Sequence, residues 1–104
     1  MVSLRSIIKK RLEKYLELDS DGIRLVLMKI FLRVKEVTID DIHEELSKKF
    51  DLTRNAVASM VGYIHSKLGV LRKNKTSYKE TSTYSIKEKY VDTVKNALKN
   101  ANGS

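Results

Sequence analysis

Residues 23–34 limit the possible folds most strongly, because this segment is apolar almost all the way round when it is placed on a helix. Two apolar stripes run along it, and they consist of Ile23, Val26, Leu27, Ile30 and Val34 and of Leu25, Met28 and Leu32. A helix with two apolar faces needs two packing partners. The segment is therefore either the central core helix of the fold or a helix that also supports a dimer.

The rest of the chain has few residues that break helices. It contains no proline and only four glycines in 104 residues, so we expect short loops and a mainly helical fold. We expect one domain over residues 1–104, because neither an internal repeat nor a linker divides the chain. Apolar spacing predicts a first helix over about 3–18, whose apolar face consists of Leu4, Ile7, Ile8, Leu12, Tyr15 and Leu16.

Capping residues predict where two further helices begin and where one of them ends. Thr38 has the position of an N-cap, with Asp41 at the third helical position. Thr53 is expected to cap a helix over residues 53–68, and Gly69 is a natural stop for that helix.

Two β-like runs follow, at residues 70–73 and 81–86, and the residues between them are polar and basic. This pattern predicts an antiparallel hairpin, with a short strand near Val37 beside it. Ser85 and Glu88 have the spacing of a capping box, which predicts that a last helix begins here.

The stretch between the third and fourth helices carries a recognisable motif. It consists of an apolar and a small residue, a spacer, a turn position, an apolar residue, a hydroxyl cap and a buried β-branched residue, here Leu46, Ser47, Asp51, Leu52, Thr53 and Val57. This order resembles the helix-turn-helix of DNA-binding regulators. Asp51 stands where that motif often has glycine, and Asp tolerates turn conformations well.

With the hairpin added, the order resembles a winged helix-turn-helix with a core at about 23–87. Helices at about 3–18 and 86–99 would flank this core. The resemblance implies a mainly α fold with a small β-hairpin wing, an α+β class. It is similar to the DNA-binding half of ferric-uptake-type and related repressors, and an uncharacterised archaeal regulator family is a further candidate.

Charge points to an anionic partner. The formal net charge is +8, and residues 53–79 hold six basic and no acidic side chains. We predict double-stranded DNA binding by a transcriptional regulator, with helix 53–68 in the major groove and wing 70–86 on the backbone. The candidate DNA-binding residues are Thr53, Arg54, Asn55, Ala58, Ser59, Tyr63, Lys67, Arg72, Lys73, Lys75 and Lys79.

Each residue type in this set suits one kind of contact. Arg54 can reach a guanine or a phosphate, and Asn55 can bridge to an adenine or a phosphate. The hydroxyls of Ser59 and Tyr63 can donate to phosphates, and the small Ala58 permits a close approach. Cations on the wing would follow the backbone or enter a minor groove.

Several alternatives remain open from the sequence. The winged helix could bind a protein partner or RNA, the small face of helix 53–68 could pack on another helix, and the lysine-rich hairpin could be a solvated edge. A homodimer through the terminal helices is another option. Tyr78 and Tyr84 could stack on bases or fill strand and core positions. The first helix has either a solvated basic face or a second contact site at Lys9, Lys10, Arg11 and Lys14.

Other functions have little support. The chain has no cysteine for a disulfide, a thiolate metal site or a nucleophile. His43 and His65 stand on different predicted helices and form no ligand pattern, so we expect no metal, no cofactor and no enzyme activity. No apolar run spans a bilayer, and the first residues lack a signal-peptide pattern. We therefore expect a cytoplasmic protein without a membrane partner.

Overall fold

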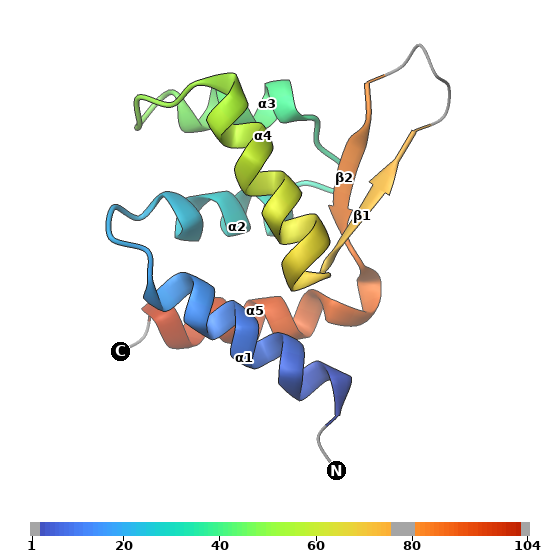
Figure 1. The fold of residues 1–104 in the computed structure, drawn as a ribbon. Coiled ribbons are helices and arrows are strands. Elements are labelled where there is room, and N and C mark those ends of the chain that lie inside the picture. The colour runs from blue at the N-terminus through green and yellow to red at the C-terminus, as the bar shows by residue number, and fades with distance from the viewer. Residues whose placement is uncertain (1–2, 76–80, 103–104) are drawn as a thin grey trace.

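The computed structural model describes residues 3–75 and 81–102, and the predicted order of helices and strands is confirmed in them (Figure 1). The class is mainly α with a small β-hairpin, which is α+β. The α-helices are α1 (Leu4–Glu17), α2 (Ile23–Arg33), α3 (Ile39–Leu46), α4 (Arg54–Tyr63) and α5 (Val91–Asn102). The remaining elements are the π-helix η1 (Ile64–Leu68), the strands β1 (Leu71–Asn74) and β2 (Thr83–Ile86) and the 3₁₀-helix η2 (Glu88–Tyr90).

The two strands form an antiparallel hairpin that is anchored at its base. Leu71 pairs with Ile86, and Asn74 pairs with Thr83. Val37, just before α3, forms an isolated antiparallel bridge with Tyr84 through two backbone hydrogen bonds of 3.0 and 2.8 Å. The predicted short strand near Val37 is thus a single bridge, and it joins the hairpin to the start of α3.

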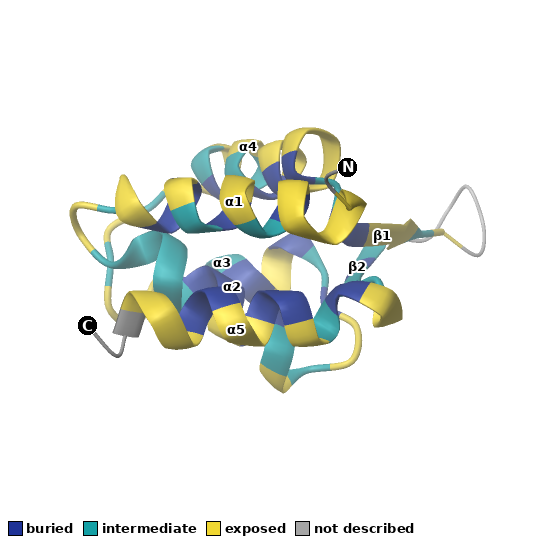
Figure 2. Cartoon of the chain, turned by 90° about the horizontal axis from the view of Figure 1, so that it is seen from below, coloured by how far each residue is buried: buried dark blue, intermediate teal, exposed yellow. Residues whose placement is uncertain are grey.

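Helix α2 lies inside the fold, where it packs against α1, α3 and α5 (Figure 2). Its buried residues are Leu27, Met28, Ile30 and Phe31. Leu25, Val26, Leu32 and Val34 are partly buried and pack against the same core. Central burial, the first of the two alternatives for this helix, is confirmed. The predicted stripes missed Phe31, although it is only 3% exposed.

The apolar face of α1 is shorter than its sequence predicts. Ile8, Leu12 and Leu16 are buried, and α1 packs closely against α5. Leu4 and Ile7 continue the same spacing but are 59% and 36% exposed. The prediction that they belong to the core is wrong, because no described element covers the first turn of α1.

Helix α4 runs on into a π-helix, and the chain then turns at a left-handed glycine. Gly69 has φ +73° and its N–H donates to the carbonyl of Ile64, so the predicted stop is confirmed. The single α-helix expected over 53–68 is instead α4 followed by η1. Leu68 is buried at the end of this π-helix.

The predicted capping box at the last helix is wrong. Ser85 pairs with Arg72 in the hairpin, so its backbone is extended and it does not precede a helix. The chain forms the short η2 before α5, and the cap residue of η2, Lys87, makes no side-chain cap bond. Strand pairing therefore took precedence over the local capping pattern.

Candidate nucleic-acid interface

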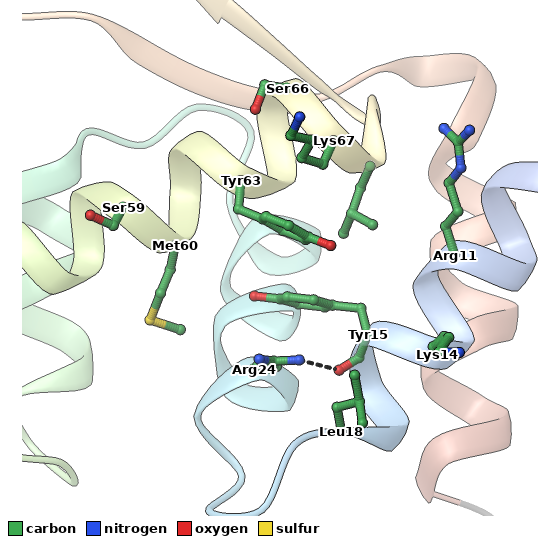
Figure 3. Close-up of a pocket in the computed structure, with 11 residues that line it drawn as sticks. Arg11, Lys14, Tyr15, Leu18, Arg24, Ser59, Met60, Tyr63, Ser66 and Lys67 are labelled. Atoms are coloured by element: carbon green, nitrogen blue, oxygen red, sulfur yellow. Dashed lines mark hydrogen bonds between the residues drawn. The ribbon is translucent and has the colours of Figure 1, made fainter.

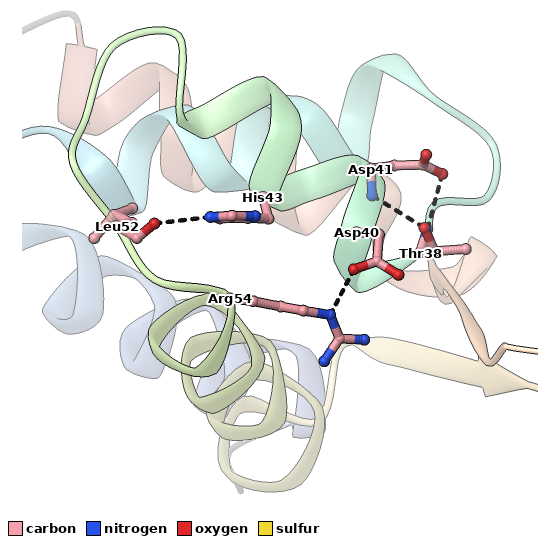
Figure 4. A network of polar contacts seen from close by, with 6 residues as sticks. All are labelled: Thr38, Asp40, Asp41, His43, Leu52 and Arg54. Carbon is pink, nitrogen blue, oxygen red and sulfur yellow. Dashed lines mark hydrogen bonds and ion pairs between the residues drawn. The ribbon is translucent and has the colours of Figure 1, made fainter.

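Side-chain hydrogen bonds fix the start of α3 and the turn that connects α3 to α4 (Figure 4). Thr38 Oγ1 accepts from the Asp41 N–H at 3.1 Å, and the Asp41 carboxylate accepts from the Thr38 N–H at 3.3 Å, so the predicted cap is confirmed. His43 Nε2 lies 2.8 Å from the carbonyl oxygen of Leu52. Since a carbonyl only accepts, Nε2 carries the proton, and His43 holds the turn that leads to α4.

Helix α4 buries one side and leaves a polar side outside. Thr53 caps it as predicted, because its Oγ1 accepts from the Ala56 N–H at 3.1 Å. The inward residues of α4 and η1 are Val57, Val61, Ile64 and Leu68. The outward residues include Asn55, Ser59, Gly62 and Ser66. No acidic residue occurs anywhere in 54–68, so this exposed face carries no negative side chain.

Arg54 is positioned by a neighbouring carboxylate. Its Nε donates to Asp40 Oδ1 at 2.5 Å, across the gap between α4 and the start of α3 (Figure 4). The two side chains are 51% and 63% exposed. Arg54 therefore lies at the edge of the exposed face. To contact a base, its guanidinium would have to break the ion pair with Asp40 or bind the base and Asp40 at the same time.

Two other predicted contact residues are partly used for packing. The ring of Tyr63 stacks on that of Tyr15 from α1, with centroids 5.6 Å apart and an interplanar angle of 17°. Tyr63 is still 48% exposed. Ala58 is half-buried and packs against the core.

Strand alternation places Lys73 and Arg72, two of the basic residues predicted to contact DNA, on opposite faces of the hairpin. Lys73 shares a face with Tyr84, and its Nζ lies 5.9 Å from the centre of that ring. The Tyr84 ring meets His65 of η1 edge-on at 6.2 Å, so this face is turned toward the helix. Tyr84 itself is buried, which confirms the core role over base stacking.

Arg72 points to the other face of the hairpin. It lines a hollow together with Glu36 and Glu88, away from the exposed side of α4. Lys75 is exposed just after β1. Lys79 and Tyr78 lie outside the described residues. The hairpin thus brings Lys73, but not Arg72, to the α4 side.

A pocket of about 840 Å³ lies between α1, the start of α2 and the C-terminal half of α4 (Figure 3). We call it the basic pocket, and its lining residues are Arg11, Lys14, Tyr15, Leu18, Arg24, Ser59, Met60, Tyr63, Ser66, Lys67 and Leu68. Four of these are cations and none is acidic. The sequence left Arg11 and Lys14 open as a contact site, but it gave no signal that pairs Tyr15 with Tyr63 or adds Arg24.

Two side chains near these elements have shifted pKa values, one because it is buried and the other because it is paired with cations. Burial raises the pKa of the Tyr15 hydroxyl, and the nearby Arg24 opposes this shift. At the end of α3, the hydrogen bond from Lys48 lowers the pKa of Glu45, and Arg33 acts in the same direction. Lys48 and Arg33 are therefore engaged with Glu45 rather than with the exposed face of α4.

Within residues 3–75 and 81–102, no three His, Cys, Asp or Glu side chains come together as a metal site. In the same ranges, no helix has both the length and the apolar character that crossing a bilayer requires.

The fold and the site together define an α+β protein that exposes one polar helix beside a hairpin. The chain belongs to the family described as "Protein of unknown function (DUF2551)", whose model matches residues 12–94. It is also similar to an "Uncharacterized protein" of Archaeoglobus fulgidus, at 36% identity over 89 residues, which cover 85% of this chain and 89% of the relative. No solved structure matches the chain significantly.

Proposed function

We propose that this protein is a winged-helix protein that binds double-stranded DNA and regulates transcription without catalysing a reaction. The observation that carries the proposal is the exposed face of α4, which is polar, small and free of acidic residues over 54–68. An α-helix fits the major groove, and such a face can approach base edges closely. We expect the protein to act in the cytoplasm, as its sequence predicts.

The charges beside α4 favour the same proposal. Lys73 stands on one side of the helix, Lys75 is exposed just after β1, and Lys67 is exposed near the end of the helix. Cations in these places would contact phosphates and fix the register of the helix on the duplex. Asn55, in the first turn of α4, and Ser59, near its middle, would then face the bases.

The surface of α4 fits a protein partner less well. The large apolar side chains that are exposed in the described part of the chain are Leu4, Ile7, Leu18 and Tyr63. Only Tyr63 belongs to α4, and it stacks on Tyr15. A protein-binding face would carry a contiguous apolar patch. A homodimer through the terminal helices would rest on Leu4 and Ile7, since the rest of the apolar face of α1 is buried.

The experiment compares two substitutions on a duplex that has been selected for tight binding. Asn55→Ala should reduce the preference for the selected duplex over random duplex, by about 1–3 kcal/mol if the side chain makes a good base contact. Lys73→Ala should weaken both duplexes equally and make the salt dependence shallower. The matched controls Asn96→Ala and Lys95→Ala are exposed on α5, on the opposite side of the molecule, and should change neither quantity (Figure 2).

The outcomes separate the candidate functions. Equal binding by the parent and both α4-side variants would refute the proposed face. No binding to mixed-sequence duplex at low salt would favour a protein partner. Tighter binding to single-stranded or structured RNA than to duplex DNA would favour the RNA alternative.

A further inference from the structure

The floor of the basic pocket is a stack of three side chains, Arg24, Tyr15 and Tyr63 (Figure 3). The guanidinium carbon of Arg24 lies 4.4 Å from the centre of the Tyr15 ring, and its Nη1 donates to the Tyr15 carbonyl at 2.8 Å. Tyr15 stacks in turn on Tyr63. Arg24 is therefore committed to the floor of the pocket, and it cross-links α1 to α2.

The other three cations of the pocket are available for a ligand. Arg11, Lys14 and Lys67 are exposed, and none of them takes part in the three ion pairs found among residues 3–75 and 81–102. Tyr63 adds a hydroxyl group at the rim, whereas the hydroxyl of Ser66 donates to the Gly62 carbonyl at 2.8 Å. Cations and hydroxyl donors without an acidic neighbour are the partners that a phosphate group accepts from.

The pocket and the hairpin lie on opposite flanks of the same helix. Tyr63 contacts α1, whereas His65 contacts Tyr84 of the hairpin. These two positions are about 200° apart around an α-helix. A helix with its side chains is about 10–12 Å wide, and the major groove is about 12 Å wide. Each flank of a helix in that groove therefore faces one of the two sugar-phosphate backbones.

We propose that the basic pocket binds a backbone phosphate of the duplex, on the strand opposite to the one that the hairpin contacts. This inference rests on the proposed DNA binding by α4. Arg11 and Lys14 supply the charge from α1, and Lys67 supplies it from η1. Helix α1 thus becomes part of the DNA-binding surface, and the footprint reaches across the full width of the groove.

The test removes two charges in the pocket and compares them with two charges elsewhere. The double variant Arg11→Ala/Lys14→Ala is matched by Lys10→Ala/Lys95→Ala, which has the same net charge and leaves the pocket intact. Each phosphate contact contributes about 0.9 to the slope of log K against log salt. Between 50 and 200 mM salt, the affinity of the pocket variant should therefore fall about 3.5-fold less than that of the parent. The control should keep the slope of the parent, and circular dichroism checks that all variants fold.

The salt slopes of the pocket variant, the control and Lys73→Ala together support or overturn the phosphate site. It is overturned if the pocket variant keeps the parent slope while Lys73→Ala lowers it, a result that leaves DNA binding by α4 intact. Equal slope losses in the pocket variant and the control also overturn it, because the effect then follows net charge alone. A parent that binds no duplex overturns both proposals.

A second arm identifies the source of the phosphate. Inorganic phosphate is titrated into the parent at constant ionic strength while amide NMR shifts are followed. Saturable shifts at the pocket together with an unchanged DNA slope in the pocket variant would assign the site to a free phosphate compound and overturn the proposal. Shifts that are absent or weak, combined with the lower slope, support the backbone phosphate.

Discussion

The ion pair between Arg54 and Asp40 should restrain DNA binding, and Asp40→Asn tests this. Both side chains are more than half exposed, so the pair itself adds about 0–1 kcal/mol to the stability of the fold. Asp40 also lies in the first turn of α3, where its charge favours the helix by about 0.3–1 kcal/mol. We expect Asp40→Asn to lower the free energy of unfolding by about 1 kcal/mol, which leaves the protein folded.

The same substitution should strengthen binding to duplex DNA. It removes a negative charge beside α4 and frees the guanidinium of Arg54, which is already at the edge of the exposed face. One added phosphate contact makes the salt slope steeper by about 0.9, which is about 3.5-fold in affinity over a fourfold change in salt. Fluorescence anisotropy with a labelled duplex at several salt concentrations measures both quantities.

A matched control exists on the opposite side of the molecule. Asp92 stands at the second position of α5, as Asp40 does in α3, and it is also exposed. Asp92→Asn removes the same charge from the same kind of helix end and should leave the salt slope unchanged. The reasoning is refuted if Asp40→Asn binds DNA no better than Asp92→Asn does.

The remaining predictions concern stability. Burial raises the pKa of the Tyr15 hydroxyl above its usual value of about 10, so the stabilising contribution of the neutral hydroxyl is complete below that pH and is lost as the pH rises through the folded pKa. Urea unfolding should therefore show the parent losing stability above about pH 10 more steeply than Tyr15→Phe does, and identical profiles would contradict this. Gly69→Ala should cost about 1–2 kcal/mol in thermal unfolding, because Gly69 has φ +73° and open space around it, so the cost is conformational. Gly62 also has open space around it but is helical, so the control Gly62→Ala should stabilise the fold by up to about 1 kcal/mol. A Gly69→Ala variant as stable as the parent would contradict this expectation.

The elements that depend on local pattern could be predicted from the sequence. The caps at Thr38 and Thr53 and the stop at Gly69 involve only neighbouring residues, and all three predictions are confirmed. The short strand predicted near Val37 is present only as a single bridge to Tyr84. Local patterns failed where a distant partner competed, as at Ser85, whose pairing with Arg72 excludes the predicted cap.

The site could be predicted only in part, for the same physical reason. Periodicity identified the exposed side of α4, since buried and exposed positions follow the helix repeat. It could not show that Tyr63 stacks on Tyr15, which is 48 residues away, or that Arg54 meets Asp40. These contacts depend on how the helices cross, and no pattern within one helix encodes that angle.

The bridge between Val37 and Tyr84 has a consequence for how this family can diverge. Both of its hydrogen bonds join backbone groups, so they do not depend on which side chains stand at the two positions. Both side chains are buried, so core packing restricts which residues can stand there, and proline is excluded because it has no N–H to donate. The orientation of the hairpin relative to α3 should therefore be inherited even where the sequence of the hairpin has drifted. Members of the family can then exchange the exposed side chains of the hairpin on an unchanged backbone frame.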